Sequence, residues 1–462
     1  MLPVIALVGR PNVGKSTLFN YLTRSRDALV ADYPGLTRDR QYGRIKRGER
    51  ACLIIDTGGL CEQAQGIEAM AERQVQQALQ EADLIFFLLD ARAGLHPSDH
   101  TITEQLRKTG KPVILIANKI DGIDAHAAAE FHALGMGTPF PITATHGRGV
   151  AALLEQAETE LPTKPDNTLA AGAHGISIAV IGRPNVGKST LINRLLGEER
   201  VVVFDQPGTT RDSVLIPFQR NDKDFTLIDT AGIRRRSKVT EAIEKFSIIK
   251  ALQAIEQAHV VIYVIDASEG ITEQDASLLG MVLEAGRSLV IGLNKWDGLS
   301  SDQRDLIKRH IEVKLQFLEF AEKHFISALH GTGVGNLFDV VQEIYEHAMI
   351  DMSTSALSVL LTQAIDAHQP PLVQGRRIKL KYAHQGGRNP PTIVIHGNQT
   401  AALPHAYKRY LMNFFRDKMN LAGTPVRLEF RSSDNPFKDR PNPLSASQIH
   451  KRKRMIKHRK KN

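Results

Sequence analysis

The chain has 462 residues, enough for about three domains with cores of their own, and a formal net charge of +9. No apolar run reaches the roughly 18 residues that a membrane span needs, and the N-terminal segment lacks a signal-peptide pattern, so neither a membrane protein nor a secreted protein is expected. Cys52 and Cys61 are the only cysteines and have no paired metal-ligand spacing. This argues against a disulfide framework or a zinc site and favours the cytoplasm.

A glycine-rich loop follows the first predicted strand, the apolar run from Val4 to Val8, and a helical pattern starts directly after the loop. The same eight letters return 173 residues later, after the apolar run from Ile178 to Ile181. Glycines let consecutive backbone N–H groups turn toward a phosphate chain, and the helix N-terminus adds partial positive charge. We therefore predict two nucleotide-binding loops, formed by Gly9, Arg10, Pro11, Asn12, Val13, Gly14, Lys15 and Ser16, and by Gly182, Arg183, Pro184, Asn185, Val186, Gly187, Lys188 and Ser189.

Each loop is followed by residues that suit a metal-bound triphosphate. We expect the loop lysine to reach the β and γ phosphate oxygens and the loop serine to bind Mg²⁺. A Pro-Gly-x-Thr-Arg-Asp segment and an Asp-Thr-x-Gly segment come next in both copies, and their Thr and Asp complete the metal shell or orient a metal-bound water. The predicted metal-site residues are Ser16, Thr37, Asp56, Ser189, Thr210 and Asp229.

The Asp-Thr-x-Gly segments are predicted to contact the γ phosphate through a backbone N–H and to relax after hydrolysis. Many regulatory GTPases carry a Gln directly after this motif to position the attacking water, but here Leu60 and Ile233 stand there and cannot do so. The nucleotide-binding residues predicted from these segments are Asp56, Thr57, Gly58, Gly59 and Leu60, with Asp229, Thr230, Ala231, Gly232 and Ile233.

Hydrolysis then needs another source of positive charge. In GTPases that share the Gly-x-Pro-Asn-x-Gly-Lys pattern, the Asn helps to hold K⁺ beside the β and γ phosphates, where a cation stabilises the developing charge. The alternative is that this Asn only forms hydrogen bonds within its own loop. The predicted catalytic residues are Asn12, Lys15, Thr37, Asn185, Lys188 and Thr210.

The nucleobase is selected by a third motif, which follows the apolar runs at 113–117 and 289–293. Its final Asp can accept hydrogen bonds from guanine N1 and N2, a donor pattern that adenine lacks, so GTP is favoured over ATP. A later Thr143-Ala144 or Ser327-Ala328 pair stands where a backbone amide could meet guanine O6. The predicted guanine-site residues are Asn118, Lys119, Ile120 and Asp121, and Asn294, Lys295, Trp296 and Asp297.

The apolar runs in both copies lack alternation, which predicts strands buried on both faces of a mostly parallel sheet flanked by helices. All motifs fall at the carboxyl ends of these strands, where such sheets bind ligands. The fold class is therefore α/β, with two P-loop GTPase domains at 1–161 and 176–352, separated by a linker at 162–175.

The last part of the chain is basic. Residues 353–462 contain 21 Lys and Arg against 5 Asp and Glu, whereas residues 1–352 carry a net charge of −7. The pattern predicts a helix to about His368, strands at 376–382, 392–396 and 426–430, and a helix at 405–419 between the last two strands. The tail, 441–462, contains no acid and is expected to be disordered alone. Such charge favours a polyanion partner.

The duplicated Gly-Arg-Pro-Asn-Val-Gly-Lys-Ser loops, the Pro-Gly-x-Thr-Arg-Asp segments and the Asn-Lys-Trp-Asp motif resemble those of the Der (EngA) family of bacterial tandem GTPases. This resemblance covers nearly the whole chain. It implies a KH-like α/β sandwich at 353–440 and a role in maturation of the large (50S) ribosomal subunit, with rRNA and ribosomal proteins as partners. No Gly-x-x-Gly loop joins two helices here, so the candidate phosphate contacts are instead Lys379, Lys381, Lys408 and Arg409.

Two alternatives stay open from the sequence. The same phosphate-loop pattern occurs in GTPases of tRNA modification and membrane transport, and GTP could serve only to stabilise a scaffold. Duplication, the missing membrane segment and the basic C-terminal part favour the ribosome-assembly interpretation. Nothing in the sequence requires more than a monomer.

Overall fold

The computed structural model describes residues 2–23, 42–45, 50–57, 75–76, 78–122, 125–162, 175–197, 201–203, 214–229, 248–373 and 376–432. Most of the predicted linker and the whole basic tail lie outside these residues. The chain divides into two compact units. One unit contains Met1–Asp351, Gly387–Thr392 and Phe415–Arg427, and the other contains Met352–Gly386, Ile393–Phe414 and Leu428–Asn462.

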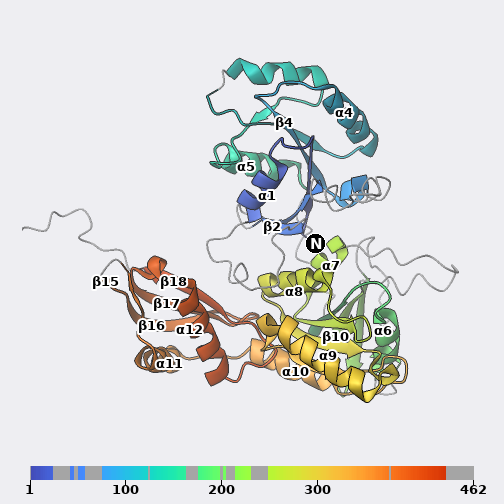
Figure 1. The fold of residues 1–462 in the computed structure, drawn as a ribbon, viewed down its shortest axis with the longest axis vertical. Coiled ribbons are helices and arrows are strands. Elements are labelled where there is room, and N and C mark those ends of the chain that lie inside the picture. Colours follow the sequence, from blue (N-terminus) through green and yellow to red (C-terminus); the bar gives the residue numbers. More distant parts are fainter. Residues whose placement is uncertain are drawn as a thin grey trace, which may run out of the picture. The chain divides into compact units, whose positions relative to one another are not determined.

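The first GTPase module is a mostly parallel sheet with helices on both faces, as predicted (Figure 1). Its described elements are β1 (Val4–Val8), α1 (Lys15–Thr23), β2 (Tyr42–Ile45), β3 (Cys52–Asp56), β4 (Leu84–Asp90), α4 (Pro97–Thr109), β5 (Val113–Asn118), η1 (Ala125–Leu134), β6 (Phe140–Pro141) and α5 (Val150–Glu160). The strand order is β2-β3-β1-β4-β5-β6, and β2 is antiparallel to β3.

Both faces of this sheet are buried, which explains the unbroken apolar runs. Alternate residues of β1 point to opposite sides, because successive strand side chains alternate. Ile5 packs in one cluster with Leu18 of α1 and Leu153 of α5, whereas Ala6 belongs to a second cluster with Leu106 of α4.

The second module repeats this architecture with an extra antiparallel edge strand. Its described elements are β7 (Ile176–Ile181), α6 (Lys188–Leu196), β8 (Val201–Val203), β9 (Val214–Arg220), β10 (Lys223–Asp229), α7 (Ile248–Gln257), β11 (Val260–Asp266), α8 (Glu273–Ala285), β12 (Ser288–Asn294), η4 (Trp296–Gly298), α9 (Ser301–Lys314), η5 (Gln316–Leu318), β13 (Glu322–Phe325) and α10 (Leu337–Ala348). The strand order is β13-β12-β11-β7-β10-β9-β8, with β8, β9 and β10 paired antiparallel. The central strands carry the motifs at their carboxyl ends, as in the first module.

The C-terminal part contains the predicted helix–strand–strand–helix–strand order. Its described elements are α11 (Thr354–Ala367), β14 (Leu372–Val373), β15 (Arg376–Arg377), β16 (Lys379–Gly387), β17 (Thr392–Asn398), η6 (Thr400–Ala402), α12 (His405–Lys418) and β18 (Arg427–Ser432). The three-stranded sheet has the order β16-β17-β18. The hydroxyls of Tyr407 and Tyr410 on α12 donate to the carbonyls of His368 and Ala364, which ties α12 to α11.

One sequence prediction was wrong here. We expected a single strand at 376–382, but β15 pairs with β14 whereas β16 enters the three-stranded sheet. The change of sheet occurs at Ile378, whose side chain is buried although its neighbours Arg377 and Lys379 are exposed. Alternation of basic and apolar residues cannot show that a strand changes partners midway.

The segment between α12 and β18 is built into the second GTPase module. The N–H of Leu289 donates to Gly423 O (2.8 Å), and the N–H of Gly423 donates to Phe320 O (2.7 Å). The buried Thr424 hydroxyl donates to Ile344 O (3.1 Å). Gly423 has φ +65°, and a Cβ there would lie 2.2 Å from Ile344 Cδ1, so no other residue fits without displacement.

We therefore expect Gly423→Ala to destabilise the second module by about 2 to 4 kcal/mol, because it adds both a left-handed backbone penalty and an overpacked methyl group. The chain has a single tryptophan, Trp296, which lies in this module. Urea unfolding followed by its fluorescence therefore reports on the affected region. Gly335→Ala, at a glycine with open space around its Cβ position, is the control. Equal unfolding midpoints for the two variants would contradict the prediction.

Candidate nucleotide sites

Each predicted phosphate loop turns sharply between a central strand and the helix that follows it. In the first module Asn12 has φ +65° and Gly14 has φ +101°, and in the second Asn185 has φ +63° and Gly187 has φ +97°. Left-handed residues within such a turn direct neighbouring N–H groups to the same side, which creates an anion-binding concavity. The lysines begin helices α1 and α6, so the concavity opens at two helix N-termini.

An asparagine side chain braces each loop from beneath. Asn118 Nδ2 donates to Val13 O (2.8 Å), while its Oδ1 accepts from the N–H of Ala144 (3.0 Å). The amide thus joins the phosphate loop to the Thr143-Ala144 loop. A Cβ on Gly14 would lie 2.3 Å from Asn118 Nδ2, so the glycine is required by this close approach as well as by its φ.

The second module contains the same brace. Asn294 Nδ2 donates to Val186 O (2.8 Å), and the N–H of Ala328 donates to Asn294 Oδ1 (2.9 Å). Both asparagine side chains are buried. Their amides are therefore engaged with the loops of the candidate site.

The lysine of the third motif pairs with the aspartate that ends the neighbouring strand, and in the first module it also contacts the phosphate loop. Lys119 Nζ donates to Asn12 O (2.7 Å) and to Asp90 Oδ2 (2.6 Å), and Lys295 Nζ lies 2.5 Å from Asp266 Oδ2. Burial alone would raise the pKa of Asp90, but hydrogen bonds from Lys119 and from backbone N–H groups bring it below its usual value. The pKa of Asp266 is lowered against burial in the same way, by Lys295 and Ser268.

The carboxylate that ends each third motif is oriented by a hydroxyl. Thr143 Oγ1 donates to Asp121 Oδ1 (2.7 Å). In the second module a hydrogen bond from Ser327 lowers the pKa of Asp297, and His330 Nε2 lies 3.1 Å from Asp297 Oδ2. Thr143 therefore performs the same local task as Ser327.

The loop lysines are buried and directed along their own loops. Lys15 Nζ donates to Gly9 O (2.9 Å) and Arg10 O (2.7 Å), and Lys188 Nζ donates to Arg183 O (2.6 Å). These contacts hold a positive charge inside each turn of backbone.

Two of the predicted metal-site residues end strands of the two sheets. Asp56 ends β3 and Asp229 ends β10, at the same end of the sheet as the loops. The Thr57 hydroxyl donates to Leu7 O (2.6 Å), which fixes the chain after β3 to the central strand. Nine predicted site residues lie outside the described part of the chain: Thr37, Gly58, Gly59, Leu60, Thr210, Thr230, Ala231, Gly232 and Ile233.

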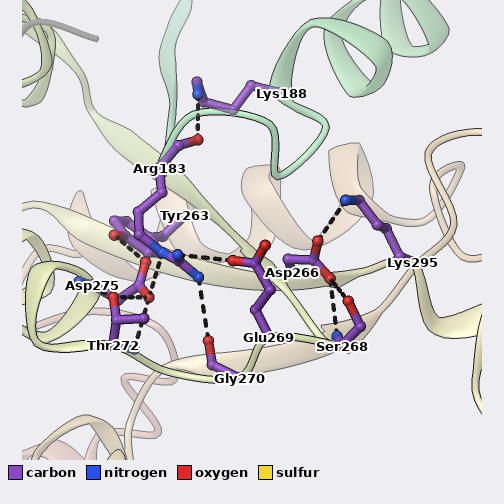
Figure 2. Close-up of polar contacts among 10 residues, drawn as sticks. All are labelled: Arg183, Lys188, Tyr263, Asp266, Ser268, Glu269, Gly270, Thr272, Asp275 and Lys295. Atoms are coloured by element: carbon purple, nitrogen blue, oxygen red, sulfur yellow. Dashed lines mark hydrogen bonds and ion pairs between the residues drawn. The ribbon is translucent and has the colours of Figure 1, made fainter.

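Two further carboxylates contact the phosphate loops and were not predicted from the sequence. Arg10 Nε donates to Asp99 Oδ1 (2.8 Å), so the loop arginine of the first module meets a buried Asp. In the second module Arg183 Nε donates to the buried Asp275 Oδ2 (2.9 Å; Figure 2). A signal was present, because the spacing from this Asp to the Asn-Lys motif is 19 residues in both copies. Spacing alone could not show that the Asp faces the loop.

The described residues contain no cluster of three or more His, Cys, Asp or Glu able to hold a metal ion by themselves. The hydroxyl and carboxylate oxygens of Ser16 and Asp56, and of Ser189 and Asp229, are nevertheless the hard donors that Mg²⁺ prefers when phosphates complete its shell. Among the described helices, none has the length and apolar character required to cross a bilayer.

Comparison with known proteins agrees with this geometry. A family model described as "50S ribosome-binding GTPase" matches residues 4–119 and again 177–295, and one described as "KH-domain-like of EngA bacterial GTPase enzymes, C-terminal" matches residues 352–431. Proteins named GTPase Der from Methylococcus capsulatus and Thioalkalivibrio sulfidiphilus are 63% and 61% identical to this chain, and 100% of each chain is covered. GTPase Der from an Enterobacter species is 55% identical with the same coverage.

The hydrogen bond from Ser327 allows a prediction about the pKa of Asp297. A lowered pKa means that the contribution of this carboxylate to stability is present above the pKa of an unfolded Asp and is lost as pH falls through the lowered folded-state pKa. Ser327→Ala should raise the pKa of Asp297 toward its ordinary value, which an NMR titration of ¹³C-labelled aspartate carboxyls measures. Ser300→Ala, which removes the cap of α9, is the control. An unchanged titration of Asp297 in Ser327→Ala would contradict this assignment.

Proposed function

This chain belongs to the GTPase Der family, and from that premise we propose that it is a GTP-hydrolysing switch acting in assembly of the large ribosomal subunit. The observation that carries the proposal is the repetition of one braced loop in both modules, with equivalent asparagine, lysine and carboxylate contacts. If either copy had lost its function, mutation would have been free to remove such contacts. We therefore assign a guanine nucleotide to each module.

Phosphate binding follows from the loop geometry. The N–H groups around the left-handed Asn12 and Asn185 would donate to phosphate oxygens, and the helix N-termini favour the same negative charge. Lys15 and Lys188 would exchange their carbonyl contacts for the β and γ oxygens, to which the ammonium groups are more strongly attracted.

Guanine selection is assigned to the oriented carboxylates. Asp121 and Asp297 would accept from guanine N1 and N2, with Thr143 and Ser327 orienting the two carboxylates. The N–H groups of Ala144 and Ala328 are already occupied by the bracing asparagines. A neighbouring amide of the same loop is thus the better candidate for guanine O6.

Magnesium is assigned to Ser16 and Asp56 in the first site and to Ser189 and Asp229 in the second, with Thr37 and Thr210 as further ligands. When bound, Mg²⁺ would neutralise charge on the β and γ phosphate oxygens. The protein residues would orient the triphosphate and its metal-bound water, while the loop lysine holds the phosphate chain in place.

Potassium is assigned to the asparagine of each phosphate loop. Asn12 and Asn185 occupy left-handed positions at the tip of the turn, and Leu60 and Ile233 cannot position water as a Gln would. A monovalent cation held by these side chains would supply the charge that other GTPases obtain from an arginine.

We expect GTP turnover to be faster in K⁺ than in Na⁺, and Asn12→Ala with Asn185→Ala to abolish this difference by removing the cation ligand. Steady-state phosphate release in the two chloride salts at equal ionic strength measures it. Asn193→Ala, on the surface of α6, is a control for loss of an amide near the second site. Equal wild-type rates in K⁺ and Na⁺ would disprove the potassium assignment.

The ribosomal partner is inferred from the family and from charge. One family model that matches both modules is described as ribosome-binding, and residues 353–462 carry a net charge of +16 whereas the rest of the chain is acidic. Lys379 and Lys381 are exposed on β16, and Lys408 Nζ lies 5.3 Å from the centre of the Phe430 ring. Such cations would bind rRNA phosphates with an affinity that falls as salt rises. This partner also places the protein in the cytoplasm.

The decisive experiment is co-sedimentation with ribosomal particles. Loaded with a non-hydrolysable GTP analogue, the chain should pellet with large-subunit particles, and with GDP it should release them. Lys15→Ala and Lys188→Ala should each weaken the analogue-dependent binding by about tenfold or more, since each removes a charge-assisted phosphate contact. Removal of residues 441–462 should weaken binding mainly at low salt.

The other interpretations predict different results. A scaffold with structural GTP would pellet equally in both nucleotide states and would show no steady-state hydrolysis. A GTPase acting on tRNA or at a membrane would bind those partners and leave large-subunit particles in the supernatant.

A further inference from the structure

Among the described residues, the loop arginine of the second module pairs with two carboxylates, whereas its counterpart in the first pairs with one. Arg183 Nε donates to Asp275 Oδ2 (2.9 Å), and Arg183 Nη1 lies 2.9 Å from Glu269 Oε2. Figure 2 shows the guanidinium between these two carboxylates, with Lys188 above it on the same loop. Burial lowers the pKa of Arg183, but Asp275 and Glu269 outweigh burial and raise it.

Asp275 is itself immobilised. Its Oδ2 accepts from the N–H and hydroxyl of Thr272 (2.9 and 2.8 Å), which completes the capping box of α8. Its Oδ1 accepts from the hydroxyl of Tyr263 (3.0 Å), which projects from β11. Burial and the nearby Asp275 raise the pKa of Tyr263 well above its usual value. The carboxylate cannot rotate without losing both the cap and the strand contact.

The first module has the same pairing of a loop arginine with a buried aspartate, but it lacks the contacts made by Tyr263 and Glu269. Asp99 accepts from Arg10 Nε (2.8 Å) and from the N–H of His96 (3.0 Å). The residue equivalent to Tyr263 is Phe87, which has no hydroxyl, and the residue equivalent to Glu269 is Ala93. Two contacts present in the second module are therefore chemically impossible in the first.

Arg183 connects these contacts to the candidate phosphate site. The side chain of Arg183 is fixed by Asp275, and its carbonyl oxygen accepts from Lys188 Nζ (2.6 Å). The backbone that presents N–H groups to phosphate is thus attached to α8 and β11 through Arg183. A loop held in its binding conformation loses less entropy when ligand binds, and such preorganisation lengthens the lifetime of the complex.

We propose that Tyr263 and Glu269 are positioning residues that stiffen the phosphate loop of the second module, so that guanine nucleotide dissociates more slowly from this site than from the first. The inference rests on the proposed binding of nucleotide at both sites. It gives the duplicated modules different nucleotide lifetimes without changing any residue that touches phosphate or base.

Dissociation of a fluorescent GDP analogue from the full-length chain tests the proposal. The Lys15→Ala background weakens the first site, so that stopped-flow release reports the second site alone. Tyr263→Phe, which copies the first module, should accelerate release by roughly three- to tenfold, and Glu269→Ala by roughly two- to threefold, since hydrogen bonds to charged groups are the stronger ones. Glu269→Asp should restore part of the slow release.

The control is Glu273→Ala, which removes an exposed charge from the first turn of α8 outside the Arg183 contacts. A general charge effect would make this variant match Glu269→Ala, and that result would overturn the proposal. Unchanged release from folded Tyr263→Phe and Glu269→Ala would also overturn it. Because the Glu269 side chain is 58% exposed, its removal should leave folding intact even if Tyr263→Phe does not fold.

The reciprocal change is Ala93→Glu in the Lys188→Ala background, where only the first site reports. A glutamate there would face Arg10 and should slow release by roughly twofold, a gain that loss of stability cannot produce. Unchanged or faster release would count against the proposal. If the unmodified chain binds no guanine nucleotide at all, the proposed function fails instead, so the two failures are distinguishable.

Discussion

Both nucleotide sites depend on a buried primary amide that holds two loops together. The amide of Asn118 donates to the phosphate loop and accepts from the Thr143-Ala144 loop, and Asn294 does the same in the second module. A buried amide deprived of one partner costs roughly 1 to 3 kcal/mol, so each loop is constrained by the other. The loop to which we assign phosphate binding and the loop to which we assign base recognition are thereby fixed as one body.

This constraint explains why the arrangement of the candidate site residues was largely predictable from sequence. A loop with two glycines and a left-handed Asn can be built in few ways, and the residues that serve it follow apolar strands whose carboxyl ends must meet. The strands β5 and β12 were recognised from their unbroken apolar runs at 113–117 and 289–293, which only a sheet covered on both faces requires. Local chemistry and strand order together determine the positions of Lys15 and Asp121.

What sequence reasoning missed depends on contacts between distant segments. Asp275 lies 92 residues from Arg183, and its role becomes visible only once α8 and the phosphate loop are placed side by side. Ile378 separates β15 from β16 because its side chain turns inward, which a pattern of basic and apolar letters does not encode. A glycine is required at position 423 because the backbone there passes close to Ile344, which lies on another segment of the chain. In each case tertiary packing decides the outcome.

Duplication offers an internal comparison that a single domain lacks. Contacts that are identical in both modules, such as those of Asn118 and Asn294, belong to chemistry that any copy must retain. Other contacts differ between the modules. The hydroxyl of Tyr263, for example, has no counterpart on the equivalent Phe87, and it contacts a residue that supports the phosphate loop and not the nucleotide itself. A change at such a position alters how firmly the loop is held while the groups facing the nucleotide stay the same. Divergence among the residues that support the phosphate loop is therefore the least disruptive way for two copies of one site to acquire different rates of nucleotide release.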